Sequence, residues 1–135
     1  MPEPTTDSCP CGHAESYADC CGRYHAGPLC LLAPTAEALM RSRYSAYTLQ
    51  LGDYLLATWH PSTRPAPPME FDTGLRWLGL QVVRHELIDA DHARVEFVAR
   101  SKLGGRAHRH REISRFVREG GRWLYFDAAD DKSLR

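Results

Sequence analysis

The feature that most constrains this chain of 135 residues is the crowding of all five cysteines into its first 30 positions. Four of them form two close pairs, Cys9 with Cys11 and Cys20 with Cys21. Adjacent cysteines make a strained disulfide, and a disulfide scaffold would spread its cysteines along the chain. Two thiol pairs on a short loop suit a tetrahedral metal site, with zinc expected and iron as the alternative. Free thiols or small buried residues are the competing interpretation.

Three nearby residues could compete for such a metal. Cys30 lies outside the spacing of the two pairs and is expected to be a spare thiol or a small apolar side chain. His13 and His25 are close in sequence, but four cysteines already complete a tetrahedral shell. We therefore expect neither histidine to be a ligand.

The two cysteine pairs, with Tyr17 in the loop between them, resemble the SEC-C motif. This small metal knuckle is known from the C-terminal tail of the preprotein translocase ATPase. The resemblance implies that the four paired cysteines are the metal ligands. In the translocase, lysines around the aromatic residue help to engage a chaperone and the ribosome, whereas residues 13–19 here contain no lysine. A protein or ribosomal partner for the knuckle is therefore expected only by analogy.

Composition excludes several classes of protein. Seventeen Lys and Arg balance seventeen Asp and Glu, so a protein that coats DNA is not expected. No apolar run reaches the roughly 18 residues of a membrane span. Residues 1–7 are acidic and no apolar stretch follows them, so they do not resemble a signal peptide. We expect a cytoplasmic protein with no membrane partner.

The remainder of the chain predicts a second, α+β unit. Thr35 is a good N-cap for a helix over 36–50, which Gly52 would end. Asp53 would cap a second, short helix that ends near residue 58. Period-two patterns follow, and two Gly-Gly pairs, at 104–105 and 120–121, are typical of hairpin turns. The strands are expected over 77–88, 93–103, 107–119 and 122–127. This order predicts an antiparallel meander with helices on one face.

Five segments of this unit resemble the bacterial YchJ family. They are Leu39 to Tyr47, Thr58 to Pro61, Trp77 to Leu80, Val95 to Arg100 and Ser114 to Phe116. The resemblance implies an N-terminal SEC-C zinc knuckle over residues 1–27. It also implies a nuclear-transport-factor-two-like, or cystatin-like, domain over residues 28–135, in which a curved sheet and helices form a cone. The family implies a fold and not an activity.

Such a cone would leave a pocket between the sheet and the helices. If the Gly-Gly pairs are two-residue turns, Trp123, Tyr125 and Asp127 share a face with Ser114 and Phe116. Asp127 in an apolar cleft would have a raised pKa and could act as a general base. The alternative is that Asp127 lies at the strand end and pairs with an arginine.

The helical region supplies further pocket candidates, which are Arg43, Tyr47, Trp59 and His60. The planar fork of Arg43 could bind a small anionic ligand, and His60 could act as an acid or base. Alternatively, Arg43 pairs with a buried glutamate such as Glu96, and Trp59 and His60 pack a corner. No complete nucleophilic triad can be assembled, so enzyme activity is left open.

The third predicted strand carries two other patterns. His108 and His110 would point to one face and could form half of a metal site, although further ligands are not evident. In the region of this strand and its flanking turns, six arginines outnumber two glutamates and could face RNA or phosphate, or they could belong to a solvated strand. These residues are Arg106, Arg109, Arg111, Arg115, Arg118 and Arg122, with Glu112 and Glu119.

Three functions remain open from the sequence. The first is a metal-stabilised interaction or adaptor protein, which we favour because a four-sulfur site is closed and therefore structural. The second is a small-molecule-binding protein or enzyme that uses the conical pocket. The third is an RNA or ribosome binder. A deep pocket with convergent polar groups would favour the second.

Overall fold

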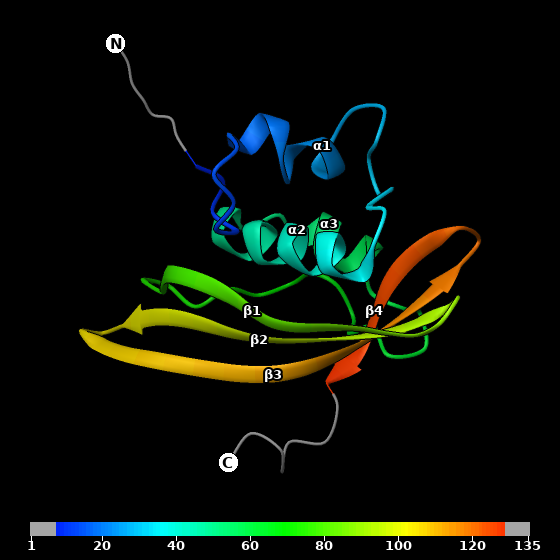
Figure 1. Cartoon of the computed structure of the whole chain (residues 1–135). Coiled ribbons are helices and arrows are strands. Elements are labelled where there is room, and N and C mark those ends of the chain that lie inside the picture. The colour runs from blue at the N-terminus through cyan, green and yellow to red at the C-terminus, as the bar shows by residue number, and fades with distance from the viewer. Residues whose placement is uncertain (1–7, 129–135) are drawn as a thin grey trace.

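The chain folds as stacked layers, in which an N-terminal segment covers one side of a helical layer and a sheet covers the other (Figure 1). The computed structural model describes residues 8–128. Residues 1–7, which we expected not to form a signal peptide, lie outside this range. So do the first residues of the predicted unit 1–27 and the last residues of the predicted unit 28–135. The elements are η1 (Tyr17–Asp19), α1 (Gly22–His25), α2 (Ala36–Leu49), α3 (Gly52–Ala57), β1 (Arg76–Asp89), β2 (His92–Leu103), β3 (Arg106–Glu119) and β4 (Arg122–Ala128). The predicted α+β class is confirmed.

The sheet is a four-stranded antiparallel meander in the order β1-β2-β3-β4. Gly104 and Gly105 join β2 to β3, and Gly120 and Gly121 join β3 to β4. All four glycines have positive φ, between 58° and 80°, as a two-residue turn of this kind requires. Both predicted hairpins are confirmed.

Helix α2 begins as predicted but ends differently. The Thr35 side chain accepts a hydrogen bond from the backbone N–H of Ala38 at 3.0 Å. The helix ends at Gln50, which adopts the left-handed conformation with φ 57°. Gly52 does not end it but opens α3, and Asp53 is not the cap. A side chain at Gly52 would meet Met69 at 3.2 Å, so the glycine is explained by this close approach of the loop.

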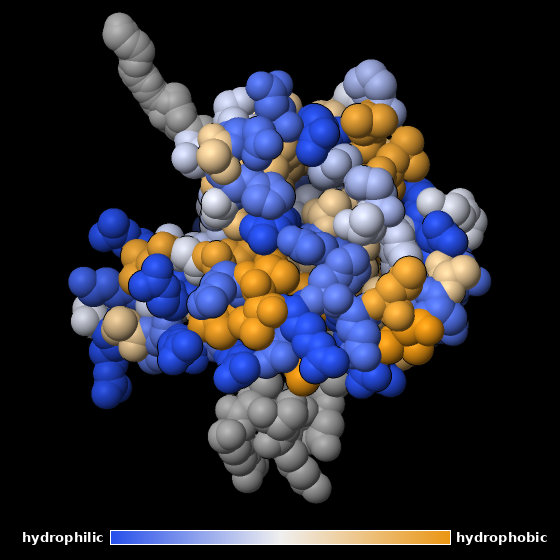
Figure 2. Space-filling view, in the orientation of Figure 1, coloured by the Kyte–Doolittle hydropathy of each residue, from blue (hydrophilic) through white to orange (hydrophobic). Residues whose placement is uncertain are grey.

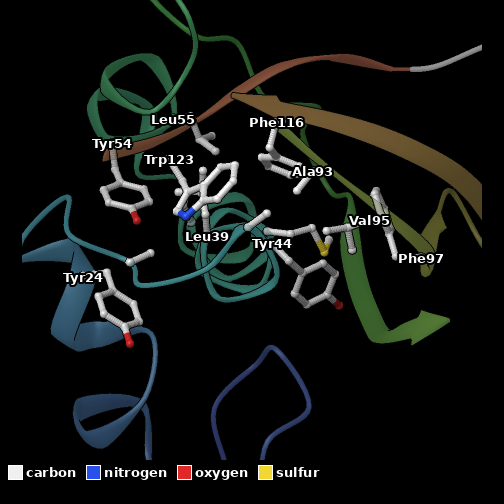
Figure 3. Packing of buried hydrophobic residues seen from close by; sticks show 14 of the residues in the cluster. Tyr24, Leu39, Tyr44, Tyr54, Leu55, Ala93, Val95, Phe97, Phe116 and Trp123 are labelled. Atoms are coloured by element: carbon white, nitrogen blue, oxygen red, sulfur yellow. The ribbon is translucent and has the colours of Figure 1, made fainter. Parts of the chain in front are cut away.

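The core lies between α2, α3 and the facing side of the sheet (Figure 3). Leu39, Leu55 and Val95 are almost completely buried there. Burial of one such side chain stabilises the fold by roughly 1.5–3 kcal/mol. Tyr24 of α1 also belongs to this core. The N-terminal segment therefore packs onto the helical layer.

A bulge in β4 changes the predicted face of one residue. Phe116 pairs with Tyr125, but Arg115 pairs with Asp127, so Phe126 is an extra residue in β4. The expectation that Asp127 shares a face with Ser114 and Phe116 is wrong, because one inserted residue reverses the alternation of side chains.

Between residues 8 and 128, no helix has the length and apolar character needed to cross a bilayer.

Candidate metal centre and ligand cavity

The four paired cysteines converge on one point in the N-terminal segment. Their sulfur atoms all lie within 4.8 Å of one another, and Cys11 Sγ is 3.6 Å from Cys20 Sγ. Four sulfurs at the usual zinc distance of about 2.3 Å would be spaced by about 3.8 Å. All four side chains are buried, and all five cysteines are free of disulfides. The donor set therefore fits a closed, tetrahedral metal site.

The local backbone brings the two pairs together. Cys9 donates its backbone N–H to Glu15 O at 2.8 Å, and Gly12 donates to Cys9 O at 3.1 Å. Gly12 has φ 103°, and a side chain there would lie 3.4 Å from Leu80 O. Glycine thus permits both the tight turn and the close approach to β1. The turn of η1 then delivers Cys20, whose N–H donates to Tyr17 O at 3.1 Å.

The thiols of the cluster differ in the direction in which their pKa values are shifted. Hydrogen bonds from Cys11 and Cys21 hold the pKa of the Cys9 thiol far below its ordinary value. Burial, followed by the hydrogen bond and charge of Cys11, raises the pKa of Cys20 to about 12. Hydrogen bonds to Cys11 and Cys9 raise the pKa of Cys21 as well. Four anionic sulfurs cannot be buried together without a cation, and a bound divalent metal would replace the shared protons.

His25 and Cys30 lie outside the four-sulfur cluster, whereas His13 borders it and forms a second group of possible ligands with Glu15 and Cys20. His13 Nδ1 lies 3.4 Å from Cys20 Sγ, and His13 is exposed. His25 uses both ring nitrogens elsewhere, with Tyr17 Oη 2.6 Å from Nδ1 and Ser42 O 2.8 Å from Nε2. Cys30 donates to His25 O at 3.6 Å.

Helix α2 holds the cysteine loop against the rest of the fold. Arg41 Nη1 donates to Cys11 O at 2.9 Å, and Ser45 Oγ lies 3.5 Å from Cys9 Sγ. The Ser42 carbonyl can only accept, so His25 carries its proton on Nε2 and accepts from Tyr17 at Nδ1. Burial lowers the pKa of His25, which favours this neutral form.

A cavity of about 300 Å³ lies between α2 and the sheet, within the size range of small-molecule sites. Seven aromatic side chains line it. Among the expected pocket residues, Arg43, Tyr47, Trp59 and Ser114 line this cavity, whereas His60 and Asp127 do not.

Arg43 is the most buried charge of the cavity, with 6% of its surface exposed. Its Nη1 donates to Leu55 O at 2.8 Å and to Thr58 Oγ1 at 2.7 Å. The guanidinium carbon lies 5.1 Å from the centre of the Trp59 ring and 4.6 Å from that of Tyr125. Burial lowers the pKa of Arg43.

The suggested pairing of Arg43 with Glu96 is wrong. Glu96 lies on β2 and is held by Arg111 of β3, whose Nη2 is 2.6 Å from the carboxylate. Across residues 8–128, no carboxylate lies within ion-pair distance of Arg43.

Sequence reasoning missed Glu112 as a cavity residue. Its carboxylate accepts from Ser114 at 2.6 Å and from Tyr125 Oη at 3.4 Å, and it lies 2.9 Å from His110 Nε2. Burial and the charge of Glu112 raise the pKa of Tyr125. The signal was present in the predicted register, because Phe97 pairs with Glu112 on one face.

The other candidates lie outside the cavity. His60 Nε2 lies 2.8 Å from the Glu119 carboxylate. Asp127 accepts two hydrogen bonds from Arg115, both at 2.6 Å, which is the alternative pairing with an arginine. In the described part of the chain, neither His108 nor His110 belongs to a cluster with metal-site geometry.

Taken together, these features define a cone-shaped α+β protein with an N-terminal cysteine knuckle. The family described as "YchJ, middle NTF2-like domain" matches residues 35–128, and the chain belongs to this family. A UPF0225 protein of Bordetella parapertussis is 54% identical over 126 residues, which cover 93% of this chain and 95% of the relative.

Two solved structures share this arrangement. The solution structure of a SEC-C motif containing protein from Rhodopseudomonas palustris has a TM-score of 0.78 and 34% identity, covering 90% of this chain and 97% of that one. The crystal structure of a SEC-C motif containing protein from Psychrobacter arcticus has a TM-score of 0.73 and 32% identity, covering 89% and 80%. The cysteine cluster and these likenesses together indicate metal binding.

Proposed function

We propose that this protein binds zinc in a structural cysteine site and a small molecule in its conical cavity. The observation that carries the second part is Arg43, a buried cation that faces an aromatic cavity and has no carboxylate partner in residues 8–128. The cysteine site has four buried sulfur donors and leaves no open position for a substrate. Chemistry or ligand binding is therefore assigned to the cavity.

Native mass spectrometry combined with elemental analysis tests the metal. Protein purified without chelator or added metal is expected to carry one zinc ion for each chain. One iron ion would support the cysteine site but contradict zinc as its metal. Metal-free protein that also fails to bind added zinc would contradict the cysteine site itself.

A cavity-filling variant tests the ligand site. Ala99 is buried in the cavity wall, so Ala99→Leu fills part of the space without adding charge. We expect a screen of small acids, amines and neutral compounds to give thermal shifts with the wild type that this variant loses. Ala107→Leu is the control, because it makes the same substitution at an exposed position of β3. Compounds that shift all three proteins equally would contradict the proposed site.

An adaptor function is the second candidate, favoured by two exposed leucines beside the knuckle. Leu29 and Leu32 lie between α1 and α2 and are 44% and 47% exposed. Figure 2 shows apolar surface at the upper right, where Figure 1 places this connection. Co-sedimentation with ribosomes tests one partner, and the double variant Leu29→Ser, Leu32→Ser should weaken it while retaining zinc. Equal sedimentation of both proteins would contradict a role for these leucines.

The arginine-rich strand gives less support to RNA binding. Arg111, Arg115 and Arg118 each have a carboxylate partner, at 2.6, 2.6 and 3.4 Å. These pairs neutralise half of the six arginines counted in the sequence. The solvated strand is the simpler account of this surface.

A further inference from the structure

Arg43 keeps unused hydrogen-bond donors inside the cavity. Both of its hydrogen bonds in the described structure leave from Nη1, to Leu55 O and Thr58 Oγ1. No hydrogen bond within residues 8–128 engages Nε or Nη2, although the residue is 94% buried. A buried cation with unfilled donors is unfavourable. The Nε–Nη2 edge is therefore free to donate to an acceptor in the cavity, and a negatively charged acceptor would also pair with the buried cation.

Arg115 shows what this edge of a guanidinium recognises. Its Nε and Nη2 each donate to one oxygen of the Asp127 carboxylate at 2.6 Å. Two parallel bonds between a planar fork and a carboxylate are both strong and geometrically specific. In Arg115 the edge is filled by the protein's own carboxylate. In Arg43 the same edge has no partner within residues 8–128, and the residue lines the cavity.

Trp59 lies beside Arg43 and contributes an aromatic surface at this place. Its indole Nε1 is buried and has no hydrogen-bond partner in the described chain. The Trp59 ring lies 5.1 Å from the guanidinium carbon of Arg43, and both residues line the cavity. An unpaired buried N–H is costly. Because the nitrogen atom itself is buried, the Trp59 ring and not its N–H is presented to the cavity. The donors that a cavity ligand can reach are therefore those of Arg43, with the Trp59 ring beside them.

The remaining walls restrict the charge and body of the ligand. Tyr44, Trp77 and Phe97 present apolar rings that favour an aromatic or apolar body. Glu112 is the acidic residue of the cavity, and Ser114, Tyr125 and His110 already occupy its oxygens. Its negative charge disfavours a ligand with two negative groups.

We infer that the cavity binds a small organic monocarboxylate with an aromatic body, whose carboxylate is held by the Nε–Nη2 edge of Arg43. This inference rests on the proposed ligand-binding function and names the class of its ligand. The aromatic body lies among the rings of the cavity, and the carboxylate lies at the wall formed by Arg43 and Trp59.

Three compounds of equal size and different head group test this inference. They are phenylacetate, 2-phenylacetamide and phenethylamine, titrated by calorimetry into the full chain with its metal. Hydrogen bonds to a charged partner are stronger than neutral ones, so phenylacetate is expected to bind at least about tenfold more tightly than the amide. Phenethylamine is expected to bind more weakly than phenylacetate, because its ammonium group cannot accept from Arg43 and is repelled by the guanidinium, even though Glu112 lies in the same cavity.

Variants of the wall locate the carboxylate. Arg43→Lys keeps the charge but removes the fork, and is expected to weaken phenylacetate at least about tenfold. Trp59→Phe removes an indole N–H that the cavity does not reach, keeps a ring, and is expected to leave the affinity for phenylacetate nearly unchanged. Glu112→Gln removes the repelling charge and is expected to tighten phenylacetate with little effect on the amide. Arg115→Lys is the matched control outside the cavity and should change neither.

The outcomes separate the ligand class from the function. Amide or amine binding as tight as phenylacetate, lost in Ala99→Leu, would overturn the carboxylate while supporting a ligand cavity. Phenylacetate binding that survives in both Arg43→Lys and Ala99→Leu would overturn the assigned site. If no compound of any class binds to the wild type, the proposed ligand-binding function fails together with the inference. Circular dichroism and metal content establish folding, and Glu112→Gln carries the test if Arg43→Lys does not fold.

Discussion

The cysteine knuckle and the cavity lie on opposite sides of one helix but are built in opposite ways. On one side of α2, Arg41, Ser42 and Ser45 contact the N-terminal segment. On the other side, Arg43 and Tyr47 line the cavity. The knuckle consists of four identical groups, the cysteine thiols, which come from nearby positions and are buried against each other. The cavity is lined by chemically different groups from α2, from all four strands and from Trp59 after α3, and donors of Arg43 are unpaired there. The closed cysteine site is thus suited to stabilising the fold, whereas the open cavity is suited to binding a ligand.

Breaking the knuckle is expected to have the largest effect. Cys20→Ser removes one of the four sulfurs, so elemental analysis should show loss of the metal. We expect faster hydrogen exchange in residues 8–24, because the loop is held through the site. Residues 36–128 should keep slow exchange, since Leu39, Leu55 and Val95 form a core of their own.

Cys30→Ser is the matched control for this experiment. It removes one sulfur from the same segment, but within residues 8–128 the thiol of Cys30 bonds only to the His25 carbonyl. Its metal content and exchange should equal those of the wild type. Global unfolding of Cys20→Ser would instead show that the knuckle and the α+β unit, predicted as residues 1–27 and 28–135, fold as one.

The knuckle could be predicted from the sequence because its chemistry is local. Cys9, Cys11, Cys20 and Cys21 lie within 13 positions, so a short loop alone brings their sulfurs together. Strand and turn patterns likewise predicted the meander, since each hairpin is specified by adjacent residues. The docking of the loop on α2 could not be predicted, because it depends on tertiary contacts of Arg41 and His25.

The contribution of helix α2 to metal binding can be tested by a variant that keeps all four sulfurs. Arg41→Met removes the hydrogen bond to Cys11 O while preserving most of the side-chain volume. Groups that orient metal ligands typically change metal affinity by about 10–100-fold, and we expect a loss at the lower end. Competition with a zinc chelator measures it. Arg84→Met, at an exposed position of β1, is the control, and equal affinities for both would contradict the role of Arg41.

The cavity was only partly predictable from the sequence. Arg43 and Trp59 could be suggested from their neighbours in the chain, but Glu112 lies in an arginine-rich strand and was counted as a compensating charge. Asp127 was misplaced because nothing in the local pattern reveals the extra residue Phe126. Side-chain alternation identifies a face only as far as the first bulge.

The link between the knuckle and α2 should depend on pH. Burial lowers the pKa of His25 below its ordinary value of 6.5. The unfolded chain therefore binds more protons than the folded one just below pH 6.5. The contribution of His25 is complete above that pH and is lost as the pH falls through it.

Urea unfolding between pH 7.5 and 5.5 measures this dependence. His25→Phe is expected to be less stable at pH 7.5, since it loses the bonds to Tyr17 and Ser42, but to lose less stability on acidification. Protonation of the cysteines affects both proteins, so the difference between their slopes is the relevant quantity. His108→Gln, at an exposed position of β3, should follow the wild type. Parallel slopes for His25→Phe and wild type would contradict the buried neutral form.

The smallest effect on stability and ligand affinity is expected for a variant of Asp127, whose carboxylate is already paired with Arg115. Arg115 and Asp127 form a two-bond pair whose side chains are 51% and 35% exposed. Exposed pairs contribute about 0.2–1 kcal/mol, so Asp127→Asn should lower the free energy of unfolding by no more than that. It should also leave the affinity for phenylacetate unchanged, because Asp127 does not line the cavity. A loss of ligand affinity comparable to that of Arg43→Lys would place Asp127 in the site and contradict the bulge in β4. A carboxylate on a guanidinium is thus expected to contribute little to stability at the exposed pair of Asp127 and Arg115. In the cavity, where the carboxylate comes from the ligand, the same pairing with Arg43 is expected to contribute strongly to affinity.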